Sequence, residues 1–136
     1  MEHTEDFRLT GEPPSIKVSE LRTVWITASF EGIHCWPEAP KEVGFLRSPH
    51  RHVFGVKVCV NVSHADRDVE FFTLKKYVQS VIFSDLFPKL QEKSSLSCEM
   101  MASLLGRVLI SKGVGVSYVE VDEDGENGAC VLFSLG

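Results

Sequence analysis

The segment HVFGVKVCVNV, residues 52–62, decides how this chain folds. Valine occupies every second position from Val56 to Val62, so these side chains lie on one side of an extended backbone. The alternation predicts a β-strand with one buried face. Residues 24–30 (VWITASF) are rich in β-branched and aromatic side chains and predict a strand before it. Residues 114–121 and 129–133 predict two further strands.

Between the second and third of these strands the hydrophobic period changes from two to that of a helix. One helix is predicted to begin near Phe71 and to end at Pro88. A second is predicted to begin at Ser97 and to stop before Gly113. The order β-β-α-α-β-β predicts an α+β fold in which a four-stranded antiparallel sheet carries two helices on one face. We expect residues 1–20 to form a flexible N-terminal arm and residues 21–136 to form one domain.

The overall composition is that of a globular domain. The chain has 136 residues, of which 43% are hydrophobic and 24% are charged. It has 14 Lys and Arg against 19 Asp and Glu, a net charge of −5, which argues against a nucleic-acid partner. No run of about 18 apolar residues occurs, so we expect no membrane span. The polar start and the four dispersed cysteines predict a cytoplasmic protein with free thiols.

Three histidines are predicted to meet at one end of the sheet. His50 and His52 are two positions apart in a strand, so both imidazoles project to the same side, and Arg51 faces away. His34 lies just past the end of the first predicted strand, which antiparallel pairing would bring beside them. Three imidazoles predict a zinc site with an open position for water or substrate. The alternative is that these are ordinary histidines.

The predicted sheet also indicates an oligomer. Four strands covered on one face leave two unpaired edges and one bare face. Closing the sheet with neighbouring subunits into a barrel would satisfy those edges.

Five short segments carry a family resemblance. They are FEGIH (30–34), HRHVF (50–54), EFFTLK (70–75), SCE (97–99) and VEVDE (119–123). In this order they resemble the motifs F-x-A-x-H, H-G-H-[NS]-[YF], D-F-x-x-L-K, [TS]-[TSA]-E and V-x-V-x-E. These motifs belong to the 6-pyruvoyl-tetrahydropterin synthases and their bacterial relatives, the 6-carboxytetrahydropterin synthases. The resemblance runs from about residue 23 to the C-terminus.

This resemblance implies the tunnelling fold, in which subunits close their sheets into a barrel, usually as a homo-hexamer of two trimers. It implies zinc on His34, His50 and His52, holding the side-chain hydroxyls of dihydroneopterin triphosphate. Glu123 matches the residue that anchors the pterin ring through its N–H groups, as a carboxylate accepting two hydrogen bonds can. Ser97 and Cys98 match positions that help to hold the ring.

The sequence departs from the family in its acid and base residues. The family cysteine four residues before His50 is Leu46 here, and the glycine between the two histidines is Arg51. The family Asp-His pair aligns best with Leu86 and Phe87, and no Asp-His dipeptide occurs in the chain. The proton-transfer groups of the family are therefore absent from their usual positions.

Two other residues are candidates for that role. Glu42 lies in the loop before His50, and its alternative role is that of a solvated loop carboxylate. Cys35 adjoins His34 and can lie near the metal. Cys98 begins a predicted helix, where the helix dipole can lower a thiol pKa. For both cysteines the alternative is a small buried hydrophobic residue.

Three functions follow from these observations. The first is a zinc-dependent lyase that acts on dihydroneopterin triphosphate or a related reduced pterin. The second is a protein that binds a pterin, purine or nucleotide without converting it. The third is a stabilising zinc site with no ligand, which we rank last because three histidines leave the coordination open.

Overall fold

A computed structural model describes residue 11 and residues 15–134. The elements are β1 (Arg22–His34), η2 (Lys41–Arg47), β2 (His50–Val62), α1 (Phe71–Val81), η3 (Ile82–Leu86), α2 (Phe87–Glu92), α3 (Cys98–Ser111), β3 (Val116–Glu123) and β4 (Asn127–Leu132). The predicted α+β class and the order of the strands are confirmed.

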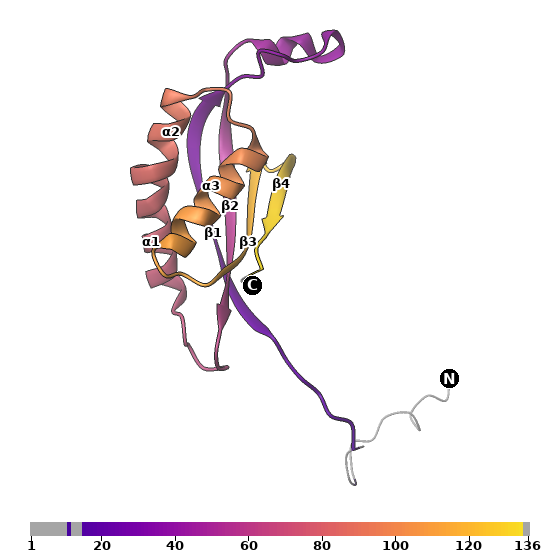
Figure 1. Cartoon of the computed structure of the whole chain (residues 1–136), viewed down its shortest axis with the longest axis vertical. Coiled ribbons are helices and arrows are strands. Elements are labelled where there is room, and N and C mark those ends of the chain that lie inside the picture. Colours follow the sequence, from indigo (N-terminus) through magenta and orange to yellow (C-terminus); the bar gives the residue numbers. More distant parts are fainter. Residues whose placement is uncertain (1–10, 12–14, 135–136) are drawn as a thin grey trace, which may run out of the picture.

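The four strands form one antiparallel sheet in the order β1-β2-β3-β4 (Figure 1). The hairpin of β1 and β2 pairs from Arg22↔Val62 to His34↔His50. The helices cover one face of the sheet, and no helix among the described residues covers the other face (Figure 1). Within the described residues, β1 and β4 are the edge strands and the sheet does not close on itself.

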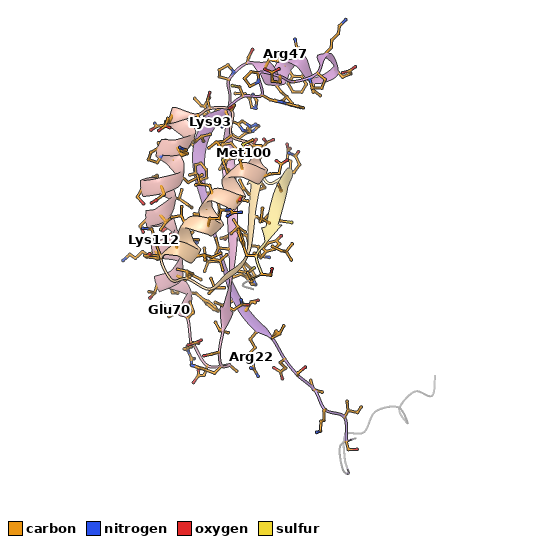
Figure 2. The ribbon with its side chains drawn as sticks, viewed as in Figure 1. Arg22, Arg47, Glu70, Lys93, Met100 and Lys112 are labelled. Carbon is orange, nitrogen blue, oxygen red and sulfur yellow. The ribbon has the colours of Figure 1, made fainter. Side chains whose placement is uncertain are left out.

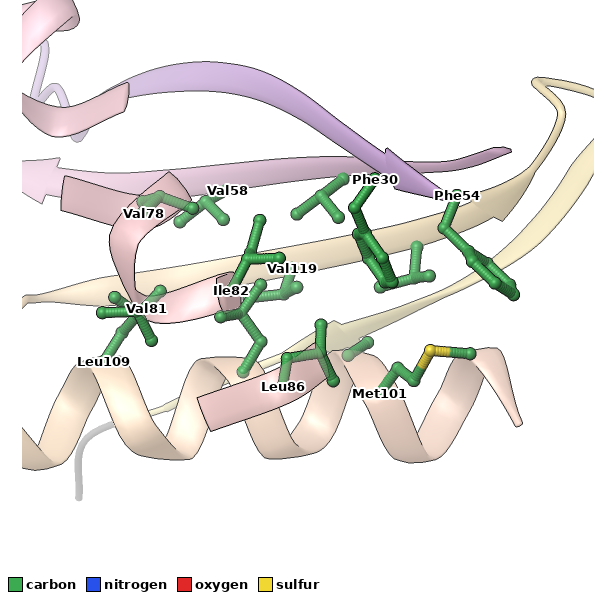
Figure 3. Packing of buried hydrophobic residues seen from close by; sticks show 14 of the residues in the cluster. Phe30, Phe54, Val58, Val78, Val81, Ile82, Leu86, Met101, Leu109 and Val119 are labelled. Carbon is green, nitrogen blue, oxygen red and sulfur yellow. The ribbon is translucent and has the colours of Figure 1, made fainter. Parts of the chain in front are cut away.

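The core lies between the sheet and the helices (Figure 3). The alternation in β2 produces it directly, since Phe54, Val56, Val58 and Val60 are all buried and the residues between them are not. Side chains from the helices and β3 pack against them, among them Val78, Val81, Ile82, Leu86, Met101, Leu109 and Val119. This packing is the main contribution to stability that the fold offers.

The boundaries of the strands differ from those predicted. β1 extends to His34, so this histidine ends the strand instead of following it. β3 and β4 begin and end differently from the segments 114–121 and 129–133 that we expected. The predicted loop 35–49 contains the short helix η2, which projects beyond the end of the sheet (Figure 1). Figure 2 labels Arg47 on this projection and Met100 at the beginning of α3.

The predicted helix end at Pro88 is wrong. The helical segment continues through α1, η3 and α2 to Glu92. The reason is the single π-helical turn η3, in which the N–H of Phe87 donates to the carbonyl of Ile82, five residues earlier. Pro88 then stands in the first turn of α2, the part of a helix in which proline is best tolerated.

The predicted N-terminal arm is described only in part. Residues 15–20 have no regular secondary structure and lead away from the sheet (Figure 1). The other residues of the predicted arm, except Gly11, lie outside the described residues.

Among the described residues, no helix has both the length and the apolar character needed to cross a bilayer.

Candidate metal centre

The register of β1 and β2 brings the three histidines together. His34 pairs with His50, and His52 pairs with Gly32, so all three imidazoles project from the helix-covered face. The ring centroids are 4.7 Å apart for His34 and His50, 5.3 Å for His34 and His52, and 4.9 Å for His50 and His52. One nitrogen from each ring lies within 4.8 Å of the others. The predicted cluster of these three residues is therefore present.

The outer nitrogen of each ring is held by an oxygen that can only accept a hydrogen bond. Nδ1 lies 2.9 Å from the Leu96 carbonyl in His34, and 2.9 Å from the Ser48 carbonyl in His50. In His52, Nδ1 lies 2.6 Å from Oδ2 of Asp124. Each Nδ1 must therefore carry the hydrogen, which leaves the lone pair of a neutral ring on Nε2. This is the outer-shell arrangement that orients histidines around a metal.

The carboxylate of Glu123 faces these lone pairs. Its Oε2 lies 3.0 Å from Nε2 of His34, and its Oε1 lies 3.8 Å from Nε2 of His52. The side-chain amide of Asn127 donates to Oε1 at 3.2 Å. An acceptor oxygen and an imidazole lone pair repel each other at such distances, so either a proton on Nε2 or a metal cation must lie between them. Three neutral imidazoles beside a carboxylate are a donor set that suits zinc.

A cavity of about 430 Å³ opens beside the cluster. His34, His50 and Glu123 form its wall at the histidine cluster. Its other walls are mainly apolar and include a few polar groups. The residues that form them are Cys35, Trp36, Leu46, Ser95, Leu96, Ser97, Cys98, Glu99, Met100, Asn127 and Gly128. Such a lining, apolar with a few polar groups, is typical of small-molecule sites. A second cavity of about 410 Å³, between β1 and α1, shares none of these residues.

Of the other predicted site residues, three line the cavity and one does not. Ser97 and Cys98 line the cavity, although the Ser97 hydroxyl already accepts from the N–H of Met100 as the cap of α3. Cys35 lines it as well, with its sulfur 3.7 Å from the Ser94 hydroxyl. Glu42 is exposed on η2 and is not among the lining residues, so it is not brought to the cluster within one chain.

Of the two alternatives for Cys98, the structure favours the small buried residue over a thiol whose pKa the helix dipole lowers. Burial, together with the nearby Glu123 carboxylate, raises the pKa of this thiol to about 12. The thiol is 3.9 Å from Oε2 of Glu123 and donates to it. Desolvation and a neighbouring negative charge outweigh the helix dipole here. At neutral pH, Cys98 is a donor in the cavity wall and not a nucleophile.

We expect Cys98 to resist alkylation. In native protein at pH 8, a thiol with a pKa of about 12 is almost wholly protonated, and only the thiolate reacts. Iodoacetamide followed by peptide mass spectrometry should label Cys98 at least tenfold more slowly than in urea-unfolded protein. The exposed Cys130 should react readily in both forms. Equal labelling of native and unfolded Cys98 would contradict this description of its surroundings.

Two residues near the cluster, Asp124 and Asn127, were not among the site residues predicted from the sequence. Their roles depend on the turn between β3 and β4, in which Asp124 and Gly125 both have positive φ, 57° and 72°. An Asp-Gly pair between strands signals such a turn, but not where its side chains point.

The positions where the resembled family has acid and base residues hold apolar side chains. Leu46 lines the cavity. Leu86 is fully buried in the core, and Phe87 packs edge-on against Phe30 with ring centroids 6.5 Å apart. None of these three can transfer a proton.

The comparisons with known proteins bear on the fold alone. No family model matches the chain, and no curated protein matches it. The crystal structure of an uncharacterized protein from Wolinella succinogenes is similar, with a TM-score of 0.59 and 15% sequence identity. The match covers 85% of this chain and 100% of that one. The chain therefore belongs to a class of α+β proteins with a four-stranded antiparallel sheet.

Proposed function

We propose that this protein is a zinc protein of the tunnelling-fold class that binds a reduced pterin beside the histidine cluster. One observation carries the proposal. The Nε2 atoms of His34, His50 and His52 turn inward because each Nδ1 is engaged by a carbonyl or a carboxylate. Three protein ligands leave one coordination position for water or a ligand hydroxyl, which is typical of catalytic zinc sites.

The cavity wall supports a pterin-like ring as the ligand. Such a ring presents N–H groups along one edge, and the Glu123 carboxylate is an acceptor for two of them. Asn127 orients that carboxylate. The Cys98 thiol, protonated at neutral pH, and the Ser97 hydroxyl lie in the same wall. Trp36 and Met100 supply apolar surface for the ring faces.

A lyase reaction on dihydroneopterin triphosphate is the first form of this function. Bound zinc would supply the polarisation of the side-chain hydroxyls of the substrate. Within one chain, Cys35 is the better placed of the two candidate proton-transfer residues, because it lines the cavity and Glu42 does not. Glu123 lies nearest to the cluster and serves as the acceptor for the ring.

Binding without conversion is the second form. Leu46 is the observation that favours it, because this side chain lines the cavity at the position where the resembled family has its cysteine. A site that keeps its zinc ligands and its ring acceptor, but has no proton-transfer residue there, can hold a pterin or a purine-like ligand without changing it. Such a protein would sequester its ligand or regulate a partner.

The open sheet edges support an oligomer. Within the part of the chain that the structure describes, the outer edges of β1 and β4 have no strand partner. Pairing β1 of one subunit with β4 of the next would satisfy both edges and close a barrel. We propose a homo-oligomer of this kind, a trimer or a hexamer of two trimers.

Native mass spectrometry of the purified protein, followed by a turnover assay, tests the proposal. We expect a trimer or hexamer with one zinc ion per chain. Incubation with dihydroneopterin triphosphate, followed by mass spectrometry of the products, separates the two forms. Turnover well above that of the His50→Ala variant supports the lyase. A retained and unchanged pterin supports binding alone. A metal-free monomer that binds no pterin would overturn the whole proposal.

A further inference from the structure

The turn between β3 and β4 is attached to β2 at one residue, Asp124. Its backbone N–H donates to the Val53 carbonyl at 2.8 Å, and its Oδ1 accepts from the Val53 N–H at 2.9 Å. Its second oxygen, Oδ2, lies 2.6 Å from Nδ1 of His52. Both carboxylate oxygens are therefore engaged with neighbouring residues of one strand, 71 and 72 positions away in sequence.

The backbone of Asp124 is in a conformation that few side chains adopt. Its φ is 57°, in the left-handed region that most L-residues avoid and that aspartate and asparagine visit more often than others. The turn alone therefore accounts for an aspartate here. What it does not require is that both side-chain oxygens contact β2, one at the Val53 N–H and one at the His52 ring.

Of the three Nδ1 acceptors around the cluster, only that of His52 is a charged side chain. The acceptors for His34 and His50 are backbone carbonyls. A carboxylate acceptor makes the ring a stronger donor to a metal through Nε2 and holds its tautomer more firmly than a carbonyl does. Asp124 also directly follows Glu123. The same turn therefore positions Glu123, the proposed acceptor for the pterin ring, and orients the imidazole of His52, a proposed metal ligand.

We infer that Asp124 is a positioning residue of the metal centre, which holds His52 as the Nδ1–H tautomer with Nε2 free for zinc. This inference rests on the proposed function, but its first consequence does not require a metal. In the metal-free protein, His52 should carry its hydrogen on Nδ1 because Asp124 accepts it.

The substitution Asp124→Asn tests this by replacing one carboxylate oxygen with an NH2 group. The side chain then has a single acceptor for two donors, the Val53 N–H and the His52 Nδ1–H. If the oxygen turns to Val53, the amide N–H faces Nδ1 and favours hydrogen on Nε2, where a metal ion would bind. We expect zinc affinity to fall by about 10- to 100-fold.

Asp122→Asn is the matched control. Asp122 is two residues earlier, and its Oδ1 accepts from the N–H of Gly125, at 2.8 Å, with no other donor to its side chain among the described residues. An asparagine oxygen can keep that bond, so zinc affinity should stay within about twofold of the parent. A second variant, Asp124→Gly, keeps the positive φ and the backbone bond to Val53 but has no carboxylate. It keeps the test valid if Asp124→Asn does not fold.

Two readouts make the outcomes distinct. Nitrogen-15 NMR of the metal-free protein reports the His52 tautomer, and chelator competition reports zinc affinity. Loss of the Nδ1–H form together with weaker zinc binding in the Asp124 variants supports the inference. An unchanged tautomer, or an equal loss of affinity in Asp122→Asn, overturns it and leaves the zinc proposal standing. If the parent protein binds no zinc, the proposed function is overturned. If His52 nevertheless has the Nδ1–H form in the parent and loses it in the Asp124 variants, the role of Asp124 in holding the tautomer is supported.

Discussion

Replacing His50 with alanine is expected to lower the zinc affinity of this protein by more than about a hundredfold. Structural zinc sites with four ligands bind with about 10–16 kcal/mol, or roughly 3 kcal/mol for each ligand. A loss of about 3 kcal/mol corresponds to a factor of about 150 in affinity. His50 is half-buried and hydrogen-bonds only the Ser48 carbonyl, so its removal should disturb the rest of the fold little.

Chelator competition and elemental analysis measure this effect, and the melting temperature gives a second reading. Zinc should raise the melting temperature of the parent and leave that of His50→Ala almost unchanged, because a ligand stabilises only the form that binds it. His64→Ala is the matched control, since His64 is exposed and lies outside the cluster. A full complement of zinc in His50→Ala, or an equal loss in His64→Ala, would show that the cluster is not the metal site.

Replacing Phe54 with alanine is expected to lower the free energy of unfolding by about 3–5 kcal/mol. Phe54 is fully buried and stacks on Phe30 with ring centroids 5.3 Å apart. Its ring also lies edge-on to those of His34 and His52, at 5.1 and 5.6 Å. The substitution therefore leaves a cavity directly behind two of the proposed zinc ligands. Zinc affinity should fall as well, because the rings lose the surface that holds them.

Urea denaturation of the metal-free protein measures the stability change without the contribution of a ligand. Phe72→Ala makes the same deletion at a side chain that is 79% exposed, and it should change stability by less than about 1 kcal/mol. If the two variants proved equally stable, the core beneath the histidines would not be packed as described.

The histidine cluster was predictable because strand geometry dictates it. Residues two apart in a strand share a face, and antiparallel neighbours joined by one loop place the end of the first strand beside the start of the second. These rules bring His34, His50 and His52 together before any packing is considered. The strand order and the α+β class follow from equally local patterns.

The remaining features depend on contacts that sequence patterns do not contain. Asp124 reaches His52 only because a turn with positive φ directs its side chain back across the sheet. The pKa of Cys98 depends on burial against Glu123, which outweighs the local effect of the helix end. Pro88 is accommodated by a π-helical turn whose hydrogen bonds no propensity predicts. In each case a non-local or irregular arrangement outweighs a sound local rule.

The register of the first hairpin has a consequence for refolding. His34 and His50 are its last pair, so a slip of one residue between β1 and β2 would place His34 on the opposite face from His50 and His52. A misaligned chain could then present at most two imidazoles to an ion. Uptake of zinc by the proposed site would thus discriminate between aligned and slipped hairpins. Zinc present during renaturation would therefore favour the native alignment of the first hairpin.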